Sequence, residues 1–337
     1  MEQAGEKRGI SQDVKEVRRK RPSGRLIALM SILVLIVIVF TLLNSQFFTV
    51  ANWDVIGLNA TILAIACIGQ TIVIISGGFD LSIGAVSAFA GVLSAELILG
   101  HVNPYLACII ALIAAAAVGA INGFFVVKIK INPLITTLGM MSIVGGITMV
   151  WTQSLSVGIP LNDLTTLGQG YLLGVPISTW LVVILYIAAG FFLVKTVIGR
   201  NVFAIGSNPH ASRVAGIRVE GMIWSVYIVA ALFAAFAGLI ALAQLSAGDP
   251  ATGASLPLNT IAAVVLGGAT LSGGKGSILG TFLATLIITA TQNGLVILNI
   301  SSYYQQIVTG TILLIAVALD QLSLVKIKSF IARSNHA

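Results

Sequence analysis

Residues 74–85 read IISGGFDLSIGA. An apolar run reaches Ile75, meets the pair Gly77 and Gly78, then the carboxylate of Asp80, and becomes apolar again. Glycine pairs free the backbone to turn, and an aspartate placed just before an apolar run can cap the helix that follows. The stretch therefore predicts two helices separated by a break, with a carboxylate at the break.

The composition around this stretch is that of a polytopic membrane protein. Hydrophobic residues make up 57% of the 337 residues and charged residues only 9%, whereas soluble domains carry about 25% charged residues. A soluble domain of this size could not bury so much apolar surface, so the bilayer is the expected solvent. The net charge of +7 is explained by basic residues beside spanning helices and does not indicate a nucleic-acid partner.

Ten segments are predicted to cross the membrane as helices, because a span needs about 20 apolar residues. They are 26–43, 55–75, 81–99, 105–127, 134–152, 179–195, 221–245, 257–271, 277–298 and 303–322. The first is interpreted as a span and not as a cleaved signal peptide, since no small-residue cleavage site follows it. The sequence thus divides into a basic arm (1–25), a transmembrane domain (26–322) and a tail (323–337).

The basic residues predict the orientation of these spans. With the arm in the cytoplasm, every Lys and Arg falls at or near the cytoplasmic face, as the positive-inside rule requires. The connections expected outside contain neither residue, and they are 44–54, 100–104, 153–178, 246–256 and 299–302. Ten spans place both termini in the cytoplasm.

A second stretch, VVLGGATLSGGKGSILG (264–280), has the same arrangement as the first. Both join two apolar runs and contain a glycine pair and Leu-Ser, and they lie in different halves of the chain. Such paired breaks predict an internal repeat in transporters. The segment LSGGK (271–275) looks like a nucleotide motif, but the spacing G-x-x-x-x-G-K-[ST] is absent. This chain is therefore not expected to bind nucleotide itself.

Two interpretations of Asp80 are open. As a cap, its carboxylate would accept a backbone N–H of the helix starting near Leu81; as a functional group, it would bind substrate hydroxyls or a proton. Neutral polar residues in or near the spans suit an uncharged polar solute, although they also form interhelical hydrogen bonds. The candidate helix-break and pathway residues are Gln70, Gly77, Gly78, Asp80, Ser82, Gln292 and Asn293.

The cytoplasmic loop 196–220 is predicted to contain one short helix. Asn208 suits the N-cap, Pro209 the first helical position and Gly216 the C-terminal end. A helix this short is marginal in water, so it must dock on this protein's own membrane face or on a partner. Its candidate contact residues are Asn208, Pro209, His210, Ala211, Ser212 and Arg213. Two isolated cysteines and three scattered histidines predict no metal site, and no catalytic group is expected.

Several of these stretches resemble one known family, the sugar-type permeases of ABC importers, of which the ribose permease is the familiar example. They are GGFDLSIGA (77–85), GRNVFAIGSNPHASRVAGI (199–217), AAVVLGGATLSGGKGSILGT (262–281) and NGLVILNISSYYQQIV (293–308). The resemblance covers about residues 26–322. Phe79 and Ile83 depart from the family's Ile and Val without removing a polar group. The family also includes branched-chain amino acid permeases, which match less closely.

The resemblance implies the membrane subunit of an ATP-driven importer in the bacterial inner membrane. The fold would be all-helical, of the vitamin B12 permease (type II) architecture, and helix 209–215 would be the coupling helix. A separate cytoplasmic ATPase, often two fused halves, would bind ATP and Mg²⁺, so this chain needs no cofactor. A second permease copy or paralogue and an extracytoplasmic binding protein for a pentose, hexose or polyol would complete the assembly. The alternative is a proton-coupled secondary transporter with Asp80 as its proton site.

Overall fold

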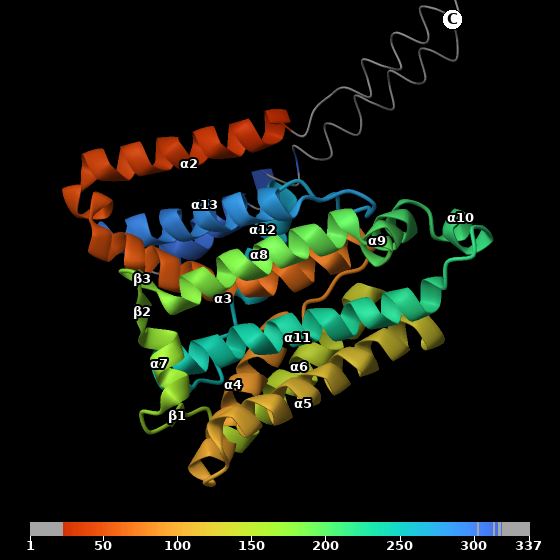
Figure 1. Cartoon of the computed structure of the whole chain (residues 1–337), viewed down its shortest axis with the longest axis horizontal. Coiled ribbons are helices and arrows are strands. Elements are labelled where there is room, and N and C mark those ends of the chain that lie inside the picture. Colours follow the sequence, from red (N-terminus) through yellow and green to blue (C-terminus); the bar gives the residue numbers. More distant parts are fainter. Residues whose placement is uncertain (1–22, 302, 313, 316–317, 319–337) are drawn as a thin grey trace, which may run out of the picture.

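The computed structural model describes residues 23–301, 303–312, 314–315 and 318 (Figure 1). The tail and all but the last three residues of the arm lie outside them. The long helices are α2 (Ser23–Leu43), α3 (Val50–Ile75), α5 (Pro104–Phe124), α6 (Pro133–Thr152), α8 (Ile177–Lys195), α11 (Val219–Leu245) and α13 (Ile278–Ile297). Within the described part of the chain, these are the seven helices long and apolar enough to cross a bilayer. The prediction of a helical, polytopic membrane protein is confirmed.

Shorter elements complete the fold. Two are apolar, α4 (Ile83–Leu99) and α12 (Leu256–Leu266). The others are η1 (Ser45–Phe48), the π-helical turn η2 (Phe125–Ile129), α7 (Asp163–Gln169), α9 (Val197–Ser207) and α10 (Pro209–Val214). Antiparallel two-residue strands pair β1 (Val157–Gly158) with β4 (Ala247–Gly248), and β2 (Tyr171–Leu172) with β3 (Val175–Pro176).

Three predicted boundaries need comment. The span predicted at 257–271 is wrong in length, because α12 ends at Leu266 after 11 residues and an irregular segment follows. The loop predicted at 196–220 contains a second helix, α9, which the sequence analysis missed. The segment predicted at 303–322 is helical over 303–312, and its end lies outside the described residues.

The helix α11 is the centre of the bundle. It packs against α3, α4 and α5, and Figure 1 shows it crossing the molecule between α8 and α5. Small side chains permit this close packing, as they do in lipid generally. The buried alanines on α11 are Ala230, Ala231, Ala234, Ala235 and Ala237. Gly119 of α5 faces α11 so closely that a side chain there would overlap the backbone of Tyr227 and Ile228.

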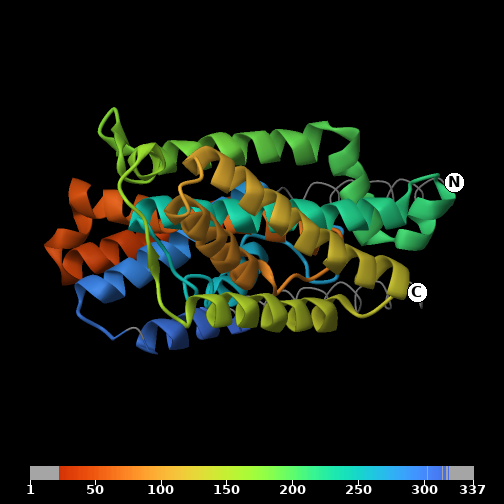
Figure 2. The ribbon, with the colours of Figure 1, turned by 90° about the horizontal axis from the view of Figure 1, so that it is seen from below.

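The two ends of the bundle differ. One end carries α10, which projects beyond the long helices (Figure 1), and we call it the α10 end. At the opposite end, α7 and the β1–β4 pair close the bundle, where Ile159 and Leu164 pack against Leu242 and Ala243. Figure 2 shows α8 and α6 on opposite sides of the molecule, with α11 between them.

The two glycine breaks meet at the α10 end. The backbone N–H of Gly274, in the segment between α12 and α13, donates a hydrogen bond of 2.8 Å to the carbonyl oxygen of Ile75, the last residue of α3. Gly206, near the end of α9, fills the remaining space, because a Cβ there would overlap that carbonyl oxygen and the Gly274 nitrogen. We call this contact of Ile75, Gly206 and Gly274 the glycine junction. The internal repeat itself stays a prediction.

Gly206→Ala is expected to lower the free energy of unfolding by about 1–3 kcal/mol, because backbone atoms cannot rotate away from the added methyl group. Gly221→Ala is the matched control, since a Cβ at Gly221 meets no atom within 4 Å and alanine favours a helix. Thermal unfolding of the purified proteins measures both. Equal midpoints for the two variants would show that the junction is not closely packed.

Candidate functional site

The segment between α3 and α4 folds around the carboxylate of Asp80, which is 0% exposed. Its Oδ1 accepts hydrogen bonds from the backbone N–H of Ser82 at 2.8 Å and from the Ser82 hydroxyl at 2.6 Å. Asn122 of α5 then donates from its Nδ2 to the Ser82 Oγ at 2.9 Å. Asp80 therefore accepts a backbone N–H beside the start of α4, as expected, but the N-cap position belongs to Ser82 and α4 begins at Ile83.

This buried cluster is only partly satisfied. Within the described chain, Oδ2 of Asp80 and Oδ1 of Asn122 have no hydrogen-bond partner. The Tyr227 hydroxyl approaches from α11 and donates to the Phe79 carbonyl at 3.3 Å. Burial raises the pKa of the Asp80 carboxyl to about 6, against the hydrogen bonds from Ser82, which lower it. The environment suits either a neutral acid or a carboxylate whose second oxygen binds water or a polar solute.

The other pathway candidates are spread over the bundle. Gln70 lies in α3, five residues before the glycine junction, and both atoms of its buried amide lack partners among the described residues. Gln292 donates to the Thr309 hydroxyl at 3.2 Å. Asn293 is its neighbour, close to the end of α13 that lies far from α10. The structure thus groups Asp80 and Ser82 with the glycine break, and it leaves Gln292 and Asn293 at the other end.

The predicted short helix is confirmed as α10. The side chain of Asn208 caps it, with Oδ1 accepting from the Ala211 N–H at 3.0 Å, and Pro209 is the first helical residue. The chain leaves the helix through Gly216, whose φ of +83° lies in the left-handed region that glycine tolerates. Local capping signals were sufficient to predict this element.

The surface of α10 is largely free. The exposed residues are Asn208, Pro209, His210, Ala211, Arg213 and Val214. Ser212 is buried and donates its hydroxyl to the Asn208 carbonyl at 2.9 Å, whereas the apolar Val214 is 79% exposed. Arg213 forms an ion pair of 2.7 Å with Glu220 of α11, which ties the helix to the bundle. The arrangement is a short, braced projection with an apolar and basic surface.

The projection is connected directly to the glycine junction. Gly206 belongs to the junction, and only Ser207 separates it from Asn208, the cap of α10. The helix α9 therefore connects α10 to the end of α3 and to the segment before α13. The sequence analysis did not find this connection, because it predicts a single short helix in the loop 196–220, and α9 is a second one.

Three contributors to the site were missed in the sequence. Asn122 and Tyr227 lie far along the chain from Asp80, and their only signal is a polar group within an apolar run. Gly206 has no local signal that separates it from the many other glycines. Within the described residues, no three or more His, Cys, Asp or Glu side chains gather as a metal site would require.

Comparison with known proteins places the chain in a family. Residues 54–317 match the family model described as the permease component of the branched-chain amino acid transport system. The chain is 40% identical over 297 residues to the ribose import permease protein of Escherichia coli K12, covering 87% of this chain and 92% of that protein. The corresponding Bacillus subtilis protein is 39% identical, covering 86% and 90%.

Permeases named for other sugars are also similar to this chain. The L-arabinose transporter permease of Azospirillum brasilense is 34% identical, covering 82% of this chain and 81% of that protein. The D-allose transport permease of Escherichia coli K12 is 34% identical, covering 86% and 90%. No solved structure matches the chain. On the extent of these matches, the chain belongs to the family of branched-chain amino acid transport system permease components.

Proposed function

We propose that the chain is the membrane-spanning subunit of an ATP-driven importer and forms the pathway for a monosaccharide. The observation that carries this proposal is the exposed, capped helix α10, joined through α9 to the glycine junction. The relatives, which are named as permeases for ribose, L-arabinose and D-allose, support a pentose, hexose or similar polyol as the solute.

The partners follow from the same proposal. A separate cytoplasmic ATPase, as one subunit type or two fused halves, binds ATP and Mg²⁺ and receives α10. An extracytoplasmic binding protein delivers the sugar, and a second copy or a paralogue completes the pathway. The α10 end faces the cytoplasm of a bacterial cell, both termini lie there, and ten helices of type II architecture span the inner membrane between the arm 1–25 and the tail 323–337.

The proposed function includes a route by which force travels from the ATPase into the bundle. Closure of the ATPase moves α10, and the ion pair between Arg213 and Glu220 together with α9 carries that motion into the bundle. The glycine junction leaves no free space for bending. Motion of α9 must therefore tilt α3 and the segment before α13 as connected bodies, which opens the pathway to one side and then to the other.

The second candidate function is a proton-coupled secondary transporter with Asp80 as the proton site. The observation in its favour is the buried carboxyl whose Oδ2 has no partner among the described residues. A carrier of this kind works without ATPase or binding protein. An importer subunit in contrast depends on both, and its selectivity rests mainly on the binding protein.

Ala211→Trp is expected to lower ATP-driven uptake on the order of tenfold or more, because a bulky residue at the centre of a small interface prevents close docking. The assay is sugar uptake into proteoliposomes that contain the ATPase and the binding protein. Ile129→Trp places the same side chain at another exposed position of the α10 end and should leave uptake near the wild-type rate. Normal uptake by the Ala211 variant would rule out α10 as the coupling element.

Asp80→Asn should retain uptake within about threefold of the wild type, because asparagine keeps an acceptor oxygen for the two Ser82 donors. Asp80→Ala should lower the thermal midpoint, since it leaves two buried donors of Ser82 unsatisfied at about 1–3 kcal/mol each. Uptake assays and thermal unfolding of both variants measure these effects. Sugar uptake by the chain alone, driven by a pH gradient and abolished in Asp80→Asn, would establish the secondary transporter instead.

A further inference from the structure

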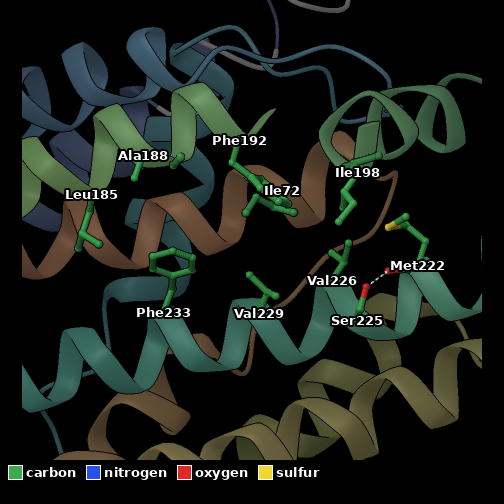
Figure 3. Close-up of a pocket in the computed structure, with 12 residues that line it drawn as sticks. Ile72, Leu185, Ala188, Phe192, Ile198, Met222, Ser225, Val226, Val229 and Phe233 are labelled. Carbon is green, nitrogen blue, oxygen red and sulfur yellow. Dashed lines mark hydrogen bonds between the residues drawn. The ribbon is translucent and has the colours of Figure 1, made fainter. Parts of the chain in front are cut away.

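An apolar cleft of about 330 Å³ lies between α8 and α11 at the α10 end (Figure 3). Leu185 and Phe192 of α8 point toward Val226 and Phe233 of α11, and Ile72 of α3 forms the floor (Figure 3). The volume is in the range of about 300–1,000 Å³ that ligand sites occupy. Its floor is buried and its rim is exposed, so the cleft opens on the side of the bundle.

The lining excludes a polar ligand. All lining residues except Ser225 are apolar, and the Ser225 hydroxyl is satisfied, since it donates to the Met222 carbonyl at 2.8 Å (Figure 3). A water in the cleft would lack the two to four polar partners that buried water needs. An occupant must therefore be a hydrocarbon chain or another apolar side chain.

The dimensions fit one leaflet of a bilayer. From Leu185 to Phe192, α8 rises about 10 Å, and from Met222 to Phe233, α11 rises about 16 Å, at 1.5 Å per residue. Half of the hydrocarbon core measures about 15 Å. The cleft starts one turn from the helix ends at the α10 end and reaches about the middle of the bundle, which is the depth of an acyl chain in the leaflet on that side.

Two basic side chains lie on the helix faces that line the cleft, one turn closer to the helix ends. Lys195 follows Phe192 by three residues on α8, and Arg218 precedes Met222 by four residues at the start of α11. Residues three or four apart share one face of a helix. Both cations are exposed, and each lies one turn beyond the cleft, where the headgroup of a lipid in the cleft would be.

These two cations lack acidic partners. In the part of the chain that the structure describes, the ion pair is Arg213 with Glu220, and neither Lys195 nor Arg218 has a carboxylate within ion-pair distance. Basic pockets between transmembrane helices on the cytoplasmic side bind anionic headgroups. We propose that the cleft binds one anionic phospholipid, with an acyl chain between α8 and α11 and its phosphate between Lys195 and Arg218.

The site would connect lipid composition to transport. Ile198 and Val202 of α9 form one wall of the cleft, so the acyl chain would support the helix that joins α10 to the glycine junction. That the α10 end faces the cytoplasm rests on the proposed function, but binding of a lipid in the cleft does not. Lipid retention by the purified full-length chain therefore tests this inference separately from uptake.

The experiment compares retention of phosphatidylglycerol and phosphatidylcholine after mild delipidation, by native mass spectrometry of the full-length protein. The wild type is expected to keep one phosphatidylglycerol in preference to phosphatidylcholine. Lys195→Gln and Arg218→Gln should each lower that preference about fivefold, because this factor is what one Lys or Arg near an anionic surface contributes to binding. Lys130→Gln removes an exposed cation of the α5–α6 connection and should change nothing. An equal loss in all three variants would overturn the site.

Filling the cleft gives an independent measurement. Ala188 lines the cleft, whereas its neighbour Ile187 is exposed on α8 outside it. Ala188→Trp should abolish retention of the tightly held lipid, and Ile187→Trp should preserve it. Equal retention by the two variants would contradict the proposal, as would disulfide-linked dimers of Ala188→Cys in membranes, which would place a second copy in the cleft. If Ala188→Trp does not fold, the charge variants decide the question alone.

Discussion

The hydrogen bond from the Gly274 N–H to the Ile75 carbonyl is the constraint on which the α10 end of the structure depends. A helix that ends inside a membrane protein leaves carbonyl groups without partners, and lipid cannot satisfy them. The chain after α3 satisfies three, since Ser76 donates to Ile72, Gly77 to Ile74 and Gly78 to Val73. The last carbonyl is satisfied by the second glycine break, so the end of α3 fixes where the segment before α13 must lie.

This constraint explains why glycines gather where they do. The second break forms hydrogen bonds of its own, between Thr270 and Gly273 and between Thr270 and Lys275. It is therefore a folded segment. Gly206 then lets α9 approach both breaks at backbone distance. Irregular backbone within a membrane is tolerated only where protein covers it. The junction is consequently a closely packed contact of α3, α9 and the segment before α13.

The sequence could predict the helix ends and breaks that are marked by residues close by in the chain. The break after Ile75 and the helix from Pro209 rest on glycine, proline and capping residues within a few positions, and both were found. The length of α12 was missed because the apolar run continues past Leu266, although Gly268 ends it with a φ of +112°. The partners of Asp80 were missed for a different reason: Asn122 and Tyr227 are brought to it by helix packing, which no local pattern records.

The direction of hydrogen bonding argues for a structural role of the carboxylate. Asn122 donates to Ser82, and Ser82 donates twice to Asp80, so the donors point toward one acceptor at the end of the chain of bonds. That order favours the charged form, whereas burial favours the neutral one. A proton carrier needs access to water in turn from each side, yet Asp80 is fully buried. Through Ser82 and Asn122, the carboxylate holds the start of α4 against α5. In the described chain, its Oδ2 and the Asn122 Oδ1 are left for water or solute.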